Sequence, residues 1–236
     1  MYRPQKGDDG CYEIEIPPDL LITNFTNPIE AIVGHTYPDM EKYKDEEFLK
    51  SRVILAATNE VVDQINDYIL NIIPSTECFE AVTPDFLHSL KTLGIPNHKI
   101  RLKISTPVML IRNLDQAEGL CNETRLIISR MTNHVIEARI ISGKKCRNFG
   151  IYSMNLTRRQ FPFIVSYAMT INKSQGQSLQ CVGLYLLQPV FSHGRLYVAF
   201  SRVQSKNGLK ILIHDKEGKP LNTTINEVFK EVLQNL

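Results

Sequence analysis

The sequence predicts an α/β domain that carries a β-rich insertion, and three stretches support this fold class. The apolar run from Val53 to Ala57 leads directly into a helical pattern, which indicates a buried strand followed by a helix. Residues 101–141 instead hold short β-rich runs separated by turns, as in the meander of a small barrel. After residue 160, strand and helix patterns alternate again, so one α/β domain encloses the insertion.

These patterns divide the chain into four parts. Residues 1–50 are irregular and contain prolines, and the stretches "IPPDLL" and "TNPIEAI" suggest a loop and short helices. Residues 51–100 and 160–214 form the predicted α/β domain, and residues 101–159 form the insertion. Residues 215–236 form a tail, in which "TTINEVFKEVLQNL" has the pattern of an amphipathic helix.

The first strand–helix pair has the clearest local signals. Thr58 stands where a helix cap is expected, and Glu60 and Asp63 fall in the first turn, where the helix dipole favours anions. The apolar stripe of the helix comprises Val61 or Val62, Ile65 and Ile69. A further short helix is predicted in the loop-like stretch that follows, at "PDFLHSLKTL".

The second half of the predicted α/β domain begins with a strand at "FPFIV". The pattern then predicts a helix over residues 166–175 that ends at Gly176, and a strand at "CVGLYLL". A second helix is predicted in "SHGRLYVAFSRV", because apolar residues recur there at helical spacing. The pair Asn207-Gly208 makes the turn into a last strand, "LKILI".

The net charge of +2 conceals an asymmetry along the chain. Residues 1–90 hold 6 Lys and Arg against 17 Asp and Glu, whereas residues 91–173 hold 14 against 4. A basic segment with so few acids is typical of a surface that binds a polyanion, most simply nucleic acid. A basic surface that is merely solvated is the alternative, and composition alone leaves both open.

Composition excludes several other classes of protein. No apolar run approaches the roughly 20 residues that a membrane span needs, and the first residues lack the form of a signal peptide. The 5 cysteines are scattered without a CxxC pair, so neither a zinc site nor a disulfide framework is indicated. A reducing cytosolic or nuclear compartment fits best.

The segment "YAMTINKSQGQSL" gathers hydrogen-bonding side chains between two apolar runs. On the predicted helix, Thr170, Lys173 and Ser174 share one face, and a left-handed Gly176 would leave nearby amides open. Such an arrangement suits a phosphate, although a polar helix face in water is an equally good interpretation of this segment alone. The next helix adds Arg195 and Arg202 two turns apart, and such an arginine can neutralise charge in a transition state.

Together these segments resemble a known family. The stretches "AMTINKSQGQSL" and "HGRLYVAFSRV" resemble motifs V and VI of superfamily-one helicases, closest to the 5′-to-3′ DNA helicases of the PIF family (superfamily one B). "RVILAATNEVVDQIN" resembles motif IV, and "LKISTPVMLIRNLDQAEGLCNETRLI" resembles the segment leading into the accessory domain. The resemblance implies a RecA-like domain, 2A, with an inserted small SH3-like β-barrel, 2B.

The resemblance also assigns residues to two ligands. It implies that Thr170, Asn172 and Lys173 lie near the DNA backbone, with Asn59 of motif IV at the DNA-facing edge. It places Gln175 and Gly176 near the γ-phosphate of ATP, and it makes Arg202 the catalytic arginine finger.

Three features depart from the family pattern. Glu123 stands where relatives often have a glycine, so the hairpin at this turn is expected to be distorted. Arg195 stands where glutamine is usual, and the stretch between "CRNFGIYSMNLT" and "RRQFP" is short, which places the end of the barrel in question.

The motifs of an N-terminal ATP-binding RecA-like domain are absent from this sequence. Its Gly-Lys pairs, in "SGKKC" and "EGKPL", lack the glycine spacing and the Ser or Thr of a phosphate loop, and no acidic pair follows an apolar strand. ATP and Mg²⁺ therefore belong to the complete helicase, no metal ligand is assigned here, and this chain alone is not expected to bind ATP tightly or to hydrolyse it.

Two functions remain open from sequence. The chain is either the C-terminal part of an ATP-dependent helicase or a stand-alone nucleic-acid-binding module without enzymatic activity. The expected partners are single-stranded DNA or DNA junctions and an N-terminal helicase half, in cis or in trans, with no membrane. The family resemblance implies a nuclear location, with the mitochondrion as the alternative.

Overall fold

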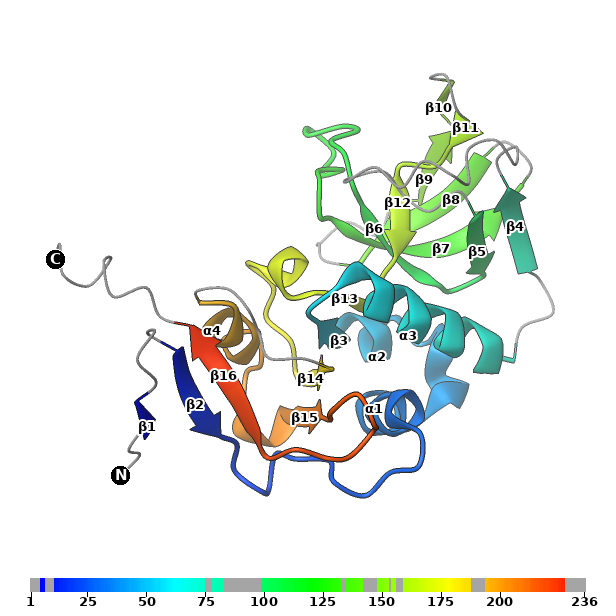
Figure 1. Ribbon diagram of the computed structural model, residues 1–236. Helices are drawn as coiled ribbons and strands as arrows, with labels where there is room; N and C mark the ends of the chain where they lie inside the picture. The colour runs from blue at the N-terminus through cyan, green and yellow to red at the C-terminus, as the bar shows by residue number, and fades with distance from the viewer. Residues whose placement is uncertain are drawn as a thin grey trace, which may run out of the picture. The chain divides into compact units, whose positions relative to one another are not determined.

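The computed structural model describes residues 5–6, 11–74, 78–82, 99–132, 135–141, 148–152, 154–155, 159–187 and 194–227. The chain forms two compact units (Figure 1). The α/β unit comprises residues 1–39, 51–65 and 168–236, and the β-rich unit comprises residues 40–50 and 66–167. These limits differ from those that the sequence suggests, and the chain passes from one unit to the other within a helix, α3 (Asn59–Ile72).

A four-stranded parallel sheet with the order β13-β3-β14-β15 forms the centre of the α/β unit. Its strands are β13 (Ala168–Thr170), β3 (Arg52–Ala56), β14 (Cys181–Leu186) and β15 (Leu209–Ile213). The side chains from Val53 to Ala56 are fully buried, as expected for parallel strands that are covered on both faces. The predicted strands at the start of motif IV, at "CVGLYLL" and at "LKILI" are confirmed.

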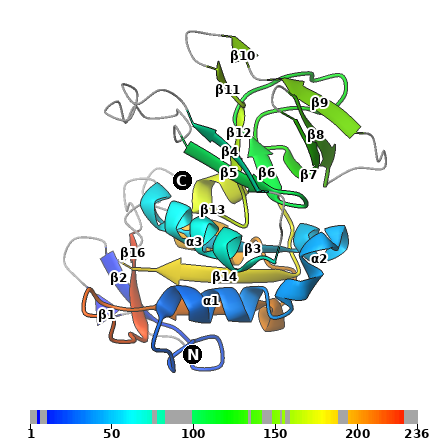
Figure 2. The ribbon, with the colours of Figure 1, turned by 90° about the vertical axis from the view of Figure 1, so that its right-hand side faces the viewer.

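Helix α1 (Pro28–Thr36) packs against β14, β15 and β3, and Figure 2 shows it running alongside β14. Asn27 caps this helix by accepting hydrogen bonds from two amides of its first turn. The approach is so close at Gly183 that a β-carbon there would collide with the hydroxyl of Thr36. The glycine in β14 is therefore required by the position of α1. The short helix suggested at "TNPIEAI" is therefore present as α1, whereas the packing of α1 on the sheet was not expected of an irregular segment.

Helix α3 follows β3 directly, as predicted. The hydroxyl of Thr58 accepts a hydrogen bond from the amide of Val61 at 3.4 Å, so the expected cap is present. Its buried face includes Val61, Val62, Ile65 and Ile69, which is the apolar stripe read from the sequence.

A second, antiparallel sheet in the α/β unit has the order β1-β2-β16 (Figure 1). Its strands are β1 (Gln5–Lys6), β2 (Cys11–Glu15) and β16 (Thr223–Glu227). The prediction of a tail helix is therefore wrong over its first residues. Thr223, Thr224 and Ile225 pair with β2 there instead. The rest of that predicted helix, residues 228–236, lies outside the described residues.

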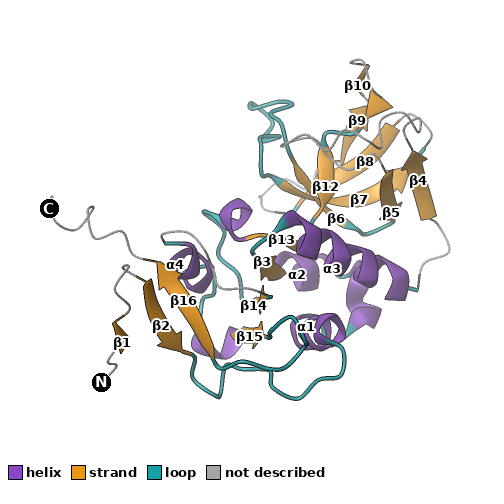
Figure 3. Cartoon of the chain, in the orientation of Figure 1, coloured by secondary structure: helices purple, strands orange, loops and turns teal. Residues whose placement is uncertain are grey.

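The β-rich unit is built on a five-stranded antiparallel sheet with the order β12-β6-β7-β8-β9 (Figure 3). Its strands are β12 (Phe163–Val165), β6 (Pro107–Leu110), β7 (Arg125–Met131), β8 (Val135–Ile140) and β9 (Asn148–Tyr152). Two strand pairs accompany it, β4 (Cys78–Val82) with β5 (Lys99–Lys103), and β10 (Met154–Asn155) with β11 (Arg159–Gln160). The predicted meander is confirmed.

Several predicted boundaries of the insertion differ from the structure. The strand at "FPFIV" exists as β12, but it pairs with β6 of the β-rich unit rather than joining the parallel sheet. Two short helices from the predicted irregular segment, η1 (Met40–Lys44) and α2 (Glu46–Lys50), also belong to this unit. The helix predicted at "PDFLHSLKTL" and the stretch from residue 142 to 147 lie outside the described residues.

The turn before β7 keeps its tight geometry although it lacks the glycine that relatives often have. The amide of Thr124 donates to the carbonyl of Cys121 at 3.1 Å, and Glu123 adopts a φ of 67°. A left-handed backbone costs a residue with a β-carbon about 1–2 kcal/mol. The hairpin is therefore not distorted as expected, and the strain is confined to one residue.

Replacing Glu123 with glycine is expected to raise the free energy of unfolding by about 0.5–1 kcal/mol, because the relieved strain exceeds the chain entropy that glycine adds to the unfolded state. Equilibrium unfolding in urea measures this change. Asn122→Gly is the matched control, because Asn122 is its exposed neighbour and has no positive φ. That control should lose stability, and a loss in Glu123→Gly would contradict the assignment of strain.

Candidate functional site

Two neighbouring parallel strands end side by side at one edge of the sheet in the α/β unit. Thr170, the last residue of β13, lies in register with Ala56, the last residue of β3. The chain leaves β3 into the first turn of α3, where Asn59 is exposed, and leaves β13 into a 3₁₀ turn, η3 (Ile171–Ser174). Ligands of open parallel sheets bind at this edge, and all four residues predicted to bind DNA lie at the ends of these two strands or in the turns that follow them.

The local structure of this stretch differs from the predicted helix over residues 166–175. Ala168 and Met169 are buried in β13, and the helical region is the single turn η3. Strand pairing with β3 buries these two residues, which the helical spacing alone does not reveal. The polar face is accordingly smaller than a helix over residues 166–175 would present.

Only part of the η3 turn faces solvent. Asn172 is exposed and Lys173 is half-buried, whereas Ser174 is fully buried and donates its hydroxyl hydrogen to the carbonyl of Ile171 at 2.6 Å. Ser174 therefore stabilises the turn rather than offering a hydroxyl to a ligand. Thr170, Asn172 and Lys173 remain the side chains of this segment that are partly or fully exposed.

The loop after η3 is exposed at Gln175 and Gly176. Gly176 has a φ of 78°, and nothing lies within 4 Å of the place where its β-carbon would be. The amides of Gln175 and Gln177 donate to the carbonyls of Asn172 and Ser174, so they are not open to a phosphate as the sequence suggested. Among the described residues the amide of Gly176 has no acceptor, so this loop can offer it to an anion.

Arg202 lies against this same loop. It follows α4 (Arg195–Phe200), which contacts η3, and its main chain is tied to Leu179 by a hydrogen bond of 2.8 Å. One terminal nitrogen of its guanidinium, Nη1, donates to the carbonyl of Ser174 at 3.4 Å and to that of Gln177 at 3.3 Å. The structure therefore brings together Gln175, Gly176 and Arg202, as predicted from two separate motifs.

The basic residues of the segment 91–173 are used partly for structure. In the β-rich unit, Lys103 is buried and donates its Nζ to the carbonyl of Ile73 at 2.7 Å. Arg125 is also buried and donates to main-chain carbonyls. The surface available to a polyanion is therefore smaller than the charge count suggests.

Two arginines of the same segment form ion pairs within the β-rich unit. Arg130 pairs with Glu137 at 3.8 Å, and Arg139 pairs with Glu46. Each pair places a carboxylate beside an arginine that the sequence alone would count toward nucleic-acid binding.

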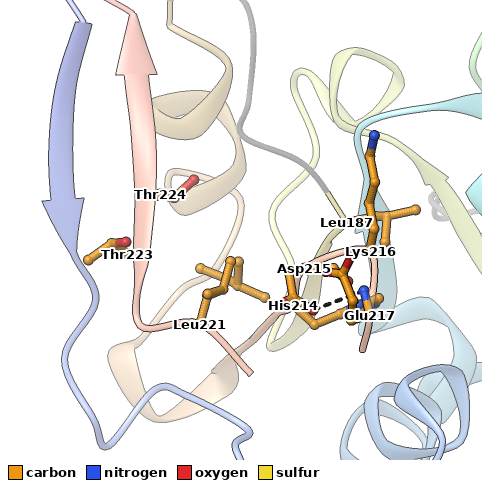
Figure 4. Close-up of a pocket in the computed structure, with 9 residues that line it drawn as sticks. Leu187, His214, Asp215, Lys216, Glu217, Leu221, Thr223 and Thr224 are labelled. Atoms are coloured by element: carbon orange, nitrogen blue, oxygen red, sulfur yellow. Dashed lines mark hydrogen bonds between the residues drawn. The ribbon is translucent and has the colours of Figure 1, made fainter. Parts of the chain in front are cut away.

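A separate pocket of about 280 Å³ lies at the carboxyl ends of β14 and β15 (Figure 4). The residues that line it include Leu187, His214 and Leu221, and none of them is a predicted site residue. His214 is buried and lies 2.8 Å from the hydroxyl of Tyr185, whose pKa is raised by burial. No motif in the sequence marks this pocket.

Neither a cluster of metal-binding side chains nor a membrane-spanning helix is found among the described residues. No group of three or more His, Cys, Asp or Glu side chains is gathered there in an arrangement that could hold a metal ion. None of the helices that the structure describes has the length and apolar character needed to cross a bilayer.

Comparison with known proteins identifies Pif1 helicases as relatives. A family model described as "DNA helicase Pif1, 2B domain" matches residues 85–131. The ATP-dependent DNA helicase PIF1 of Xenopus laevis is 30% identical over 195 residues, which are 75% of this chain and 30% of that protein. The human protein of the same name is 32% identical over 151 residues, or 58% of this chain and 23% of that protein.

Solved structures show the same fold. The crystal structure of the Pif1 helicase from Candida albicans matches 88% of this chain and 56% of that chain, with a TM-score of 0.59 and 22% identity. Bacteroides Pif1 in complex with ADP-AlF3 and ssDNA matches 84% of this chain and 49% of that chain, with a TM-score of 0.53 and 19% identity. The chain thus spans about a third or less of the curated relatives named above and about half of these structures.

Proposed function

We infer that this chain, which belongs to the PIF family of DNA helicases, acts as the C-terminal part of an ATP-dependent 5′-to-3′ helicase. In this proposal the α/β unit is the RecA-like domain 2A, and the β-rich unit is an inserted SH3-like barrel, 2B. The observation that carries the proposal is the guanidinium of Arg202, which is held against the loop that contains Gln175 and Gly176.

The chain supplies one side of an ATP site. Gln175 and the open amide of Gly176 contact the γ-phosphate, and Arg202 neutralises the negative charge that the transferred phosphoryl group carries. An N-terminal RecA-like half, in cis or in trans, supplies the phosphate loop and the groups that hold Mg²⁺. A related structure that contains ADP-AlF3 supports this arrangement. By itself the chain does not hydrolyse ATP.

The same edge of the sheet binds the sugar–phosphate backbone of single-stranded DNA or of the single strand of a junction. Asn172 and Lys173 on η3, together with Thr170 and Asn59, reach the phosphates from the ends of two adjacent strands. The proximity of η3 to Arg202 supports a short loop that contacts both ligands. The alternative of a stand-alone nucleic-acid-binding module depends on the basic segment, in which Lys103, Arg125 and Arg139 are engaged within their own unit.

Replacing Lys173 with alanine is expected to weaken binding of the full chain to single-stranded DNA. The plot of log K against log salt should also become less steep, its negative slope shrinking in magnitude by about 0.7–1, because one phosphate contact is lost. Fluorescence titration with a labelled oligonucleotide at several salt concentrations measures both quantities.

The control for this experiment is Lys216→Ala, which removes the same charge from an exposed lysine that follows β15. Because β15 is at the other end of the sheet from β13, this variant should bind DNA like the parent chain. Equal losses in the two variants would show that net charge, rather than the η3 turn, determines DNA binding.

A further inference from the structure

We propose that Ser201 is the positioning residue of Arg202, holding one side of its guanidinium in place so that the other side is offered to the phosphate. This inference rests on the proposed role of Arg202 at the γ-phosphate. Ser201 is exposed, and in the described structure Arg202 is the residue of the proposed nucleotide site that its side chain contacts.

A closed ring of hydrogen bonds connects Ser201 with Arg202. The terminal nitrogen Nη2 of Arg202 donates to the hydroxyl oxygen of Ser201 at 2.8 Å, and that hydroxyl donates to the carbonyl of Val198 at 2.9 Å. The same carbonyl accepts from Nε of Arg202 at 3.0 Å. Two atoms of the guanidinium are thereby fixed, and two fixed points determine the orientation of a planar group.

The distances separate the hydrogen bonds of Arg202 into a short and a long pair. Nε and Nη2 donate at 3.0 and 2.8 Å, within the usual range for such bonds. Nη1 donates to the loop carbonyls at 3.4 and 3.3 Å, beyond that range, so these two bonds are weak. A phosphate group is negatively charged, so its oxygens are stronger acceptors than a carbonyl oxygen. Nη1 is therefore the nitrogen that exchanges its partners for the γ-phosphate.

Ser201 is itself fixed by the end of a helix. Its amide donates to the carbonyl of Tyr197 at 2.9 Å, and it forms the C-cap of α4. A long arginine side chain loses much rotamer freedom when it is ordered, and a group that is ordered before the reaction stabilises the transition state without that loss. The hydroxyl of Ser201 supplies this order, and alanine at the same position cannot.

The first test measures the guanidinium directly in the full chain. Rotation about the Nε–Cζ bond of Arg202, followed by ¹⁵N NMR line shapes, should become about tenfold faster in Ser201→Ala, as the loss of one charge-assisted hydrogen bond predicts. Ser201→Thr keeps the hydroxyl and should rotate at the parent rate. Ser205→Ala is the matched control, because Ser205 is an exposed serine in the same segment whose side chain caps nothing.

The second test measures turnover in a fusion of this chain with the N-terminal half of Bacteroides Pif1. Ser201→Ala should lower kcat for DNA-stimulated ATP hydrolysis about tenfold with an unchanged KM for ATP, and Ser201→Thr should restore it. The proposal is overturned if Ser201→Ala rotates and turns over like the parent while Arg202→Ala abolishes turnover. If Arg202→Ala also leaves turnover unchanged, the proposed function of Arg202 fails, and the role of Ser201 in the reaction fails with it.

Discussion

Replacing Arg202 with alanine is expected to lower DNA-stimulated ATP turnover by about a thousandfold or more in a fusion of this chain with the N-terminal half of a Pif1 helicase. The guanidinium neutralises charge on the transferred phosphoryl group, and no other arginine among the described residues is held against the loop of Gln175 and Gly176. Steady-state phosphate release, measured with saturating single-stranded DNA, gives the turnover.

Two further variants separate this role from a structural one. Arg202→Lys keeps the charge but loses the planar fork, so it should recover only a small part of the turnover. DNA affinity should change less than twofold in both variants, because the bonds from Arg202 to the η3 loop are long and Ser174 stabilises the turn independently. Turnover of Arg202→Ala within threefold of the parent would contradict the assignment.

Replacing Arg125 with alanine is expected to lower the free energy of unfolding of the β-rich unit by about 2–4 kcal/mol. Its buried guanidinium donates to the carbonyls of Leu49 and Lys50, the last two residues of α2, and to that of Ser166. Carbonyls at the end of a helix have no partner within the helix, and the arginine provides one at 3.4–3.5 Å. Its removal also leaves a cavity where the buried side chain was packed. Urea unfolding, followed by circular dichroism, measures the loss.

The same strand provides the control for this experiment. Arg130 in β7 has a side chain that is 70% exposed and pairs with Glu137 at 3.8 Å, so Arg130→Ala should cost less than about 1 kcal/mol. Arg125→Met, which fills much of the same volume without donating, should fall between the two alanine variants. If Arg125→Ala is no more destabilising than Arg130→Ala, the buried arginine does not hold the end of α2.

The elements that the sequence predicted best are those whose signals lie within a short stretch of the chain. The strand β3 and the helix α3 follow from an apolar run, a capping threonine and a helical stripe, all within twenty consecutive residues, and the structure confirms each of them. The loop at Gly176 and the helix before Arg202 were likewise found, because a glycine and a motif mark them. The contact between the two, however, is visible only in the structure.

The remaining errors arise where tertiary pairing overrides a local pattern. Residues 166–170 have helical spacing, but Ala168 and Met169 are buried beside β3, a strand from a distant part of the chain. Thr223 to Glu227 belong to a helical pattern, but they pair with a strand near the N-terminus. The basic segment was counted as surface, whereas Lys103 and Arg125 are interior donors, and composition carries no information about which carbonyls a cation reaches.

The order of the parallel sheet also governs how the chain folds during its synthesis. The strand β3 lies between β13 and β14, and its pairing with β13 joins Ile54 to Ala168, 114 positions later. Ribosomes add about 5–20 residues per second, so roughly 6–20 s pass before either neighbour of β3 exists. For that time the apolar run from Val53 to Ala56 has no sheet to join, so its association with other chains must be prevented until β13 and β14 have been made.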